Sequence, residues 1–169
     1  MSNFIQHRSI CLASSSPQRH ILLKNFGLNF ESYSPKIDET PHENEKVKIY
    51  VERMAIEKAR EVQSAANKLP NDLIILAGDT TVFFEDHIFG KPKNAEHAYQ
   101  MLKKLGGKTH QVFSGFSILN KYSKEEISEV SCTDVRLQKL DDKILEWYIN
   151  TGEAFGKAGA YSIQGLGSI

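Results

Sequence analysis

The chain has 169 residues and a formal net charge of zero, because 21 Lys and Arg residues balance 21 Asp and Glu residues. This length suits one domain, or one domain with two lobes, and excludes two large independent domains. The neutral balance excludes a generally basic nucleic-acid-binding protein, although a local basic patch stays open. Apolar runs are far shorter than the ~20 residues that span a bilayer, and no charged-then-apolar leader opens the chain. We therefore expect a cytoplasmic protein that binds neither nucleic acid nor membrane.

Short strands and helices alternate along the first half of the chain. Residues 9–13 predict a buried strand, followed by a helix that Ser16 caps and Pro17 begins. We expect this helix to turn its apolar side chains to the core, namely Ile21, Leu22, Leu23 and Phe26. Residues 29–34 predict a second strand, and residues 45–66 predict a long helix whose apolar positions recur with a period near 3.6.

The second half continues this alternation. The apolar run at 73–77 predicts a central strand covered on both faces, which residues 81–84 continue. The remaining predicted elements are a helix at 94–105, strands at 109–119 and 127–137, and a helix at 141–149. The pattern is typical of an α/β protein. Cys11 and Cys132 lack metal-binding spacing, so we expect two buried, reduced thiols.

The segment from Ser14 to Arg19 lies between a predicted strand and the start of a helix. Backbone N–H groups at a helix N-terminus point outward and suit a phosphate. The hydroxyl groups add donors, and the planar fork of Arg19 matches phosphate oxygens. The alternative is a solvated turn that caps an ordinary helix, and local features alone favour it.

Two charged residues occupy informative positions. Lys58 shares the apolar face of its helix with Val51 and Met54, so its ammonium either reaches solvent or meets an anion. The sequence leaves both alternatives open. Asp79 follows the central strand, where open α/β sheets bind ligands. An aspartate there can hold Mg²⁺ or accept a proton from water; a turn cap is the alternative.

Two later segments give weaker signals. Gly90 allows a sharp turn before Lys91 and Pro92 fixes the backbone just after it, although a turn lysine is commonly only solvated. The glycine-rich segment 156–167 lacks the spacings of a P-loop or a Rossmann fingerprint. Its glycines allow close approach to a ligand, and Gln164 can hydrogen-bond to a base edge; a flexible loop is the alternative. The absence of HExxH and GxSxG spacings argues against a zinc site and a serine hydrolase.

The surviving candidates are three cations and two carboxylates: Arg19, Lys58, Lys91, Glu39 and Asp79. A nucleoside triphosphate brings about four negative charges near pH 7, and one Mg²⁺ cancels only two of them. This balance suits a metal–triphosphate complex. It suits a neutral phosphoester or a nucleic-acid strand poorly.

Five segments resemble, in order, the motifs of the Maf-like nucleotide pyrophosphatases: Leu12–Arg19, Glu57–Ala59, Ala77–Thr80, Gly90–Pro92 and Lys157–Gly165. The resemblance spans nearly the whole chain and implies a single domain over residues 1–169. It implies a mixed, twisted α/β sheet with flanking helices and two lobes around a cleft, related to the inosine triphosphate pyrophosphatases. It also implies that a homodimer hydrolyses nucleoside triphosphates to the monophosphate and pyrophosphate with Mg²⁺ or Mn²⁺.

The resemblance also implies roles for individual residues. Asp79 would be the proton acceptor or metal-linked base, and Glu39 would help to hold the metal. The residues implied to bind the triphosphate are Ser14, Arg19, Lys58 and Lys91. The positions that divide the family by substrate are Gln18, Thr80 and Gln164. Thr80 and Gln164 match the branch that acts on dTTP and UTP rather than the branch that prefers 7-methyl-GTP.

Three positions depart from the family pattern. Gln18 stands where the dTTP/UTP branch usually has Arg, and Gly156 replaces an Asp before the glycine-rich motif. The chain stops at Ile169, whereas relatives continue with a further strand and a helix. These departures keep a second hypothesis open, in which the protein binds nucleotides and regulates septum formation without hydrolysing them.

Overall fold

The structure is a computed structural model that describes residues 5–65, 70 and 72–168. The chain separates into two compact units. Unit 1 comprises Met1–Asp79 and Ser114–Val130, and unit 2 comprises Thr80–Phe113 and Ser131–Ile169. The single domain and the cleft between two lobes stay predictions.

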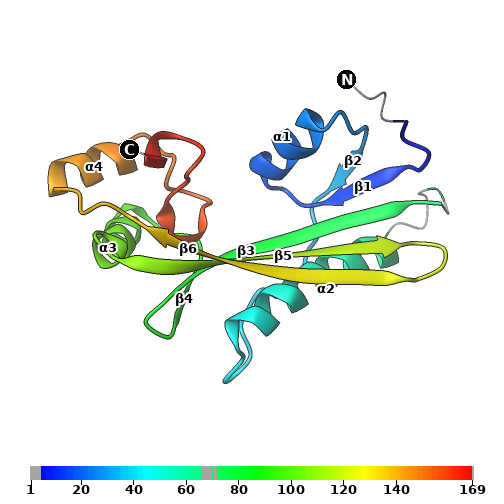
Figure 1. Ribbon diagram of the computed structural model, residues 1–169, viewed down its shortest axis with the longest axis horizontal. Coiled ribbons are helices and arrows are strands. Elements are labelled where there is room, and N and C mark those ends of the chain that lie inside the picture. The colour runs from blue at the N-terminus through cyan, green and yellow to red at the C-terminus, as the bar shows by residue number, and fades with distance from the viewer. Residues whose placement is uncertain (1–4, 66–69, 71, 169) are drawn as a thin grey trace. The chain divides into compact units, whose positions relative to one another are not determined.

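Among the described residues, six strands form one mixed sheet (Figure 1). The strands are β1 Ile10–Ala13, β2 Glu31–Tyr33, β3 Ile74–Phe84, β4 His87–Phe89, β5 Thr109–Asn120 and β6 Glu126–Arg136. Their order is β2-β1-β3-β5-β6, and β4 pairs with β3. β1 is parallel to β2 and β3, whereas β3 and β4 are antiparallel. The predicted α/β class with a mixed sheet is therefore confirmed, and the apolar run at 73–77 does continue as one strand.

The part of the chain that the structure describes contains four α-helices. They are α1 Pro17–Asn25, α2 Val47–Ala65, α3 Ala95–Leu105 and α4 Asp142–Asn150; the 3₁₀ helices η1 Ala158–Ala160 and η2 Leu166–Ser168 follow. The Asn94 side chain accepts a hydrogen bond from the N–H of His97 at 2.8 Å, which caps α3. Asp141 caps α4 in the same way, through the N–H of Ile144 at 2.9 Å. No helix in the described part of the chain is long and apolar enough to span a membrane.

The core of unit 1 lies between α2 and the sheet. It contains Cys11, Ala13, Ala59, Val62, Leu73, Ile75, Ala77 and Leu119. Gly115 of β5 permits this packing, because a Cβ atom there would lie 2.9 Å from the carbonyl oxygen of Val51. α2 therefore packs closely against the strands. This contact fixes the position of α2, which carries Lys58, relative to β3, which carries Asp79.

The expectation that α1 buries its apolar side chains is wrong for the described residues. Ile21, Leu22 and Phe26 are 56%, 53% and 69% exposed, and no residue of α1 is buried. Instead, Arg19 of this helix lies against Gly78 of β3. Periodicity identifies an apolar stripe on a helix, but it does not supply the surface that would cover the stripe.

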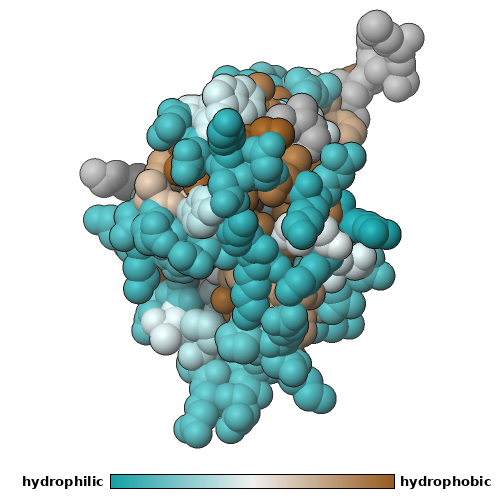
Figure 2. Space-filling model, turned by 90° about the vertical axis from the view of Figure 1, so that its left-hand side faces the viewer, coloured by the Kyte–Doolittle hydropathy of each residue, from teal (hydrophilic) through white to brown (hydrophobic). Residues whose placement is uncertain are grey.

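The core of unit 2 joins α3, α4 and η1. Its buried residues are Val82, Phe89, Ala98, Met101, Leu102, Leu105, Leu145, Tyr148, Ile149, Ala154, Ala160 and Tyr161. Figure 2 views the side that carries α3 and α4 and shows mainly hydrophilic residues with smaller hydrophobic patches between them. This distribution is expected for amphipathic helices that turn their apolar faces inward.

The expectation of two buried thiols holds for one cysteine only. Cys11 of β1 is 1% exposed, and burial raises the pKa of its thiol. Cys132 is exposed, and both thiols are free. Cys132 lies on β6, which is the last strand in the order of the sheet. An edge strand is covered less than a central one, and this difference explains the error.

Candidate functional site

The Ser14 hydroxyl organises the turn between β1 and α1. Ser14 is buried, and its Oγ accepts hydrogen bonds from the N–H of Ser16 at 3.1 Å and from Nη1 of Arg19 at 3.0 Å. Ser16 occupies the N-cap position with an extended backbone, but its side chain makes no capping bond. Pro17 begins the helix as predicted. The turn therefore holds Arg19 close to the end of β1.

Arg19 also lies directly over Gly78. A Cβ atom at Gly78 would lie 3.3 Å from Nε of Arg19 and 3.0 Å from the carbonyl oxygen of Gly115. Burial lowers the pKa of Arg19, whereas the carboxylates of Asp79 and Glu39 raise it. An arginine nevertheless stays protonated at neutral pH. A partly buried positive charge is thus placed beside the residue that precedes Asp79.

Lys58 joins two carboxylates. Its Nζ lies 2.7 Å from Oδ1 of Asp79 and 2.8 Å from Oε1 of Glu39. Lys58 is 8% exposed, so its ammonium meets anions and does not reach out to solvent. Of the two alternatives that the sequence left open, the structure has the ion-paired one. Two carboxylates from distant parts of the sequence face one buried cation.

Tyr50 fixes the backbone of Glu39, which lies in the segment between β2 and α2. The Tyr50 hydroxyl donates a hydrogen bond to the carbonyl oxygen of Glu39 at 2.9 Å. Burial raises the pKa of Tyr50 to about 12, and the negative charges of Asp79 and Glu39 act in the same direction. The phenol therefore stays protonated and remains a donor at neutral pH.

Arg53 contacts the same segment at several other points. This residue was not among the candidates identified from the sequence. It forms two 2.7 Å contacts with the Glu45 carboxylate, and its Nη1 lies 3.3 Å from Oε1 of Glu57. Its Nη2 also donates to the carbonyl oxygen of Thr40 at 3.1 Å. The i,i+4 spacing of Arg53 and Glu57 on α2 is a signal that could have revealed part of this network, whereas Glu45 lies before the helix.

Unit 2 holds the other predicted site residues. The N–H of Gly159 donates to the carbonyl oxygen of Gly90 at 3.1 Å, so the glycine-rich segment is tied to the turn that carries Lys91. Thr80, Lys91 and Gln164 are exposed. Unit 1 thus gathers Ser14, Gln18, Arg19, Glu39, Lys58 and Asp79, and unit 2 contains Thr80, Lys91 and Gln164.

The carboxylate pair of unit 1 fits a divalent cation. Among the residues that the structure describes, no cluster of three or more His, Cys, Asp or Glu side chains forms a ready-made metal cage. Mg²⁺ does not require one, because it keeps several waters and needs only one or two protein carboxylates. The side chains of Asp79 and Glu39 are 14% and 48% exposed, so solvent can reach both.

Comparison of the sequence with known proteins identifies its family. A sequence model described as Maf-like protein matches residues 9–169. The chain belongs to the Maf-like protein family. A dTTP/UTP pyrophosphatase of Ruminiclostridium cellulolyticum is 44% identical over 163 residues, which are 96% of this chain and 82% of the relative. A dTTP/UTP pyrophosphatase of Acinetobacter baylyi is 45% identical over 155 residues, which are 92% of this chain and 81% of the relative.

A solved structure of the Staphylococcus aureus Ham1 protein also aligns with this Maf-like chain. The TM-score is 0.47 and the identity is 16%, over 76% of this chain and 71% of the other. A likeness at this level carries no weight for function.

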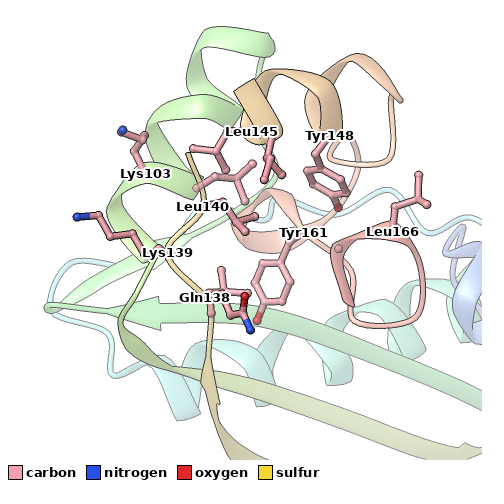
Figure 3. Close-up of a pocket in the computed structure, with 13 residues that line it drawn as sticks. Lys103, Gln138, Lys139, Leu140, Leu145, Tyr148, Tyr161 and Leu166 are labelled. Carbon is pink, nitrogen blue, oxygen red and sulfur yellow. The ribbon is translucent and has the colours of Figure 1, made fainter. Parts of the chain in front are cut away.

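Unit 2 of this Maf-like chain contains an apolar pocket between α3, α4 and η2 (Figure 3). Leu140, Leu145 and Tyr148 line it, and the Lys103 and Lys139 ammonium groups point away from it. None of the predicted site residues lines this pocket. The charged residues predicted to bind a triphosphate therefore lie outside this pocket.

Tyr161 gives the glycine-rich segment of this Maf-like chain a buried anchor. Its hydroxyl lies 2.6 Å from Nε2 of His110, and both residues are less than a tenth exposed. Burial raises the pKa of Tyr161 to about 12 and lowers the pKa of His110. Tyr161 is thus the hydrogen-bond donor and neutral His110 the acceptor. A buried side chain therefore anchors the segment for which a flexible loop was the alternative.

Proposed function

We propose that this protein is a nucleoside triphosphate pyrophosphatase that hydrolyses dTTP and UTP to the monophosphate and pyrophosphate. Relatives named for this activity are 44–45% identical over more than nine-tenths of the chain. The structural observation that carries the proposal is the buried Lys58 ammonium between Glu39 and Asp79. This cluster provides both charge types that a metal–triphosphate complex requires.

The positive groups bind the triphosphate. Arg19 and the N–H groups at the start of α1 are donors for phosphate oxygens, and Ser14 holds Arg19 in place. Lys58 turns from the carboxylates to the phosphates when substrate arrives, and Lys91 adds a further positive charge. These donors offset the charge that develops as pyrophosphate leaves.

The carboxylates activate water. Asp79 orients a water molecule toward the α-phosphorus and accepts its proton. Glu39 and Asp79 hold the divalent cation, Mg²⁺ or Mn²⁺, whose charge offsets that of the phosphates when it is bound. Tyr50 keeps Glu39 at the site through the 2.9 Å bond to its carbonyl oxygen.

Substrate choice depends on Gln18, Thr80 and Gln164. A glutamine side chain presents both a donor and an acceptor, as the edge of a thymine or uracil base does. The activity acts on free nucleotides, which fits the zero net charge of the chain better than a nucleic-acid partner. We further infer that one domain over residues 1–169 works as a homodimer in the cytoplasm, where nucleoside triphosphates are available.

The test measures pyrophosphate release from dTTP, UTP, GTP and 7-methyl-GTP, with and without Mg²⁺. We expect turnover of dTTP and UTP, and we expect Asp79→Asn to lower it by about 100-fold or more because the proton acceptor is lost. Asp142→Asn is the matched control, since Asp142 pairs with Lys103 in unit 2, outside the proposed site.

Unchanged turnover in Asp79→Asn would show that the assigned base is wrong. If nucleotides raise the Tm of the wild-type protein without any turnover, the regulator of septum formation that binds without hydrolysis is supported instead. If neither turnover nor a shift in Tm is seen, both functions are excluded.

A further inference from the structure

The segment that carries Glu39 has no regular secondary structure of its own. Residues 34–46 connect β2 with α2 and form neither strand nor helix. Even so, the Glu39 carboxylate lies 2.8 Å from a buried ammonium group. A segment without a hydrogen-bonded ladder needs side chains to hold its backbone, because its peptide groups have few internal partners.

Arg53 of α2 donates three hydrogen bonds to this segment. Its Nε and Nη2 each lie 2.7 Å from an oxygen of Glu45, which is a bidentate pair. Nη2 also donates to the carbonyl oxygen of Thr40 at 3.1 Å. The contacts of Arg53 thus reach the residue next to Glu39 and a residue near the end of the segment.

The pair between Arg53 and Glu45 is largely shielded from solvent. The side chains are 18% and 6% exposed. Arg53 lowers the pKa of Glu45 to about 2, so the carboxylate is ionised at any pH at which the enzyme would work. The guanidinium also lies over the ring of Tyr50, 5.6 Å from its centroid, and Tyr50 bonds to the carbonyl oxygen of Glu39.

We propose that Arg53 is a positioning residue that sets where the Glu39 carboxylate lies, through Thr40, Glu45 and Tyr50. The proposal rests on the proposed function, in which Glu39 holds a divalent cation. Arg53 itself does not touch substrate or metal. Only arginine offers donors in a planar fork for two carboxylate oxygens and a carbonyl at once, so lysine cannot replace it fully.

The test measures Mn²⁺ affinity of the full chain by calorimetry, without nucleotide, in a double-mutant cycle. We expect Glu39→Gln to weaken binding because a ligand is lost. We expect Arg53→Met to weaken it by about ten-fold because the ligand is no longer held in place. The double variant should bind no more weakly than Glu39→Gln alone, since position no longer matters once the carboxylate is gone.

Arg60→Met is the matched control, because Arg60 lies on the same helix and pairs with Glu126 at 2.7 Å, outside this network. Its Mn²⁺ affinity should equal that of the wild type. Arg53→Lys should recover part of the affinity. If circular dichroism shows that Arg53→Met does not fold, Glu45→Gln is used instead. It removes the charge that pairs with Arg53 and should weaken Mn²⁺ binding because Glu39 is then held less well.

Three results would overturn the inference. Equal Mn²⁺ affinity of Arg53→Met and wild type, together with weaker binding by Glu39→Gln, would show that Arg53 does not position Glu39 while the role of Glu39 stands. Additive losses in the double variant would show that Arg53 acts elsewhere. If Glu39→Gln binds Mn²⁺ as well as wild type, the metal role in the proposed function fails as well.

Discussion

The Nζ of Lys58 lies 2.7 Å from Oδ1 of Asp79 and joins α2 to β3 through a buried ion pair. The second carboxylate, Glu39, contacts the same ammonium at 2.8 Å. The Lys58 ammonium group thus contacts both carboxylates. A divalent cation that binds to Glu39 and Asp79 would compete with Lys58 for the same oxygens. This competition leads to the first prediction.

Lys58→Met should destabilise the protein and strengthen its response to metal. Without the ammonium, two neighbouring carboxylates lose the cation that they share, which should cost about 2 kcal/mol in the free energy of unfolding. Mn²⁺ should then raise the Tm of the variant more than that of the wild type, because the ion replaces the missing cation. Scanning fluorimetry with and without Mn²⁺ measures both effects.

Lys48→Met provides the control for this change, because Lys48 is exposed on the same helix. It should alter neither the Tm nor the shift with Mn²⁺. A shift in Lys58→Met that is no larger than in the wild type would show that Lys58 does not compete with the metal.

Gly78→Ala should disturb Arg19. The new Cβ atom would lie 3.3 Å from Nε of Arg19 and 3.0 Å from the carbonyl oxygen of Gly115, so both the guanidinium and the backbone of β5 have to give way. We expect the KM for dTTP to rise by about ten-fold, because a displaced cation binds phosphate less well. Steady-state kinetics measures this change. In an Arg19→Ala background, Gly78→Ala should add little; a full further rise would show that it acts on another group.

Gly159→Ala should destabilise the protein by about 2 kcal/mol. Gly159 has a φ of +69°, and a Cβ atom there would lie 2.9 Å from Cγ2 of Val82, so strain and a clash combine. Gly152→Ala is the control, because Gly152 has a φ of +82° with open space around it. It should cost only the strain, about 1 kcal/mol. If urea denaturation shows that both variants lose the same free energy of unfolding, the contact with Val82 does not contribute to the loss.

The buried pair of His110 and Tyr161 should make stability depend on pH. Burial lowers the pKa of His110 below its ordinary 6.5, so the unfolded chain binds this proton at a higher pH than the folded chain does. The stability that the buried, neutral His110 contributes is therefore fully present above about pH 6.5. It is lost as the pH falls toward the lower pKa that His110 has in the folded state. The Tm should decrease accordingly between about pH 7.5 and about pH 5.

The double variant His110→Phe/Tyr161→Phe should lose part of this dependence. Removing both partners of a buried hydrogen bond costs little, so its Tm near neutral pH should stay close to that of the wild type. The other histidines are unchanged in this variant, so any pH dependence that they cause should remain. If the wild type and the double variant respond equally to acid, His110 is not the group that senses the proton.

Much of the fold could be predicted from local patterns. Asn94 and Asp141, the first residues of two predicted helix ranges, cap α3 and α4, since a cap depends on residues within one turn of the helix. The burial of α1 and of Cys132 was predicted wrongly, because burial depends on what other parts of the chain cover. Arg53 and Tyr50 were not recognised, because their role depends on a segment that is itself irregular.

The sequence by itself determined the class of fold, the family, and which charged residues were candidates for binding a triphosphate. These conclusions follow from periodicity, from caps and from the order of motifs, all of which are read along the chain. Only the tertiary structure decided that Lys58 pairs with Asp79 and Glu39 and that Tyr50 and Arg53 hold Glu39. The reason is that an ion pair forms between groups that folding brings together, and its geometry depends on the packing of α2 against the sheet.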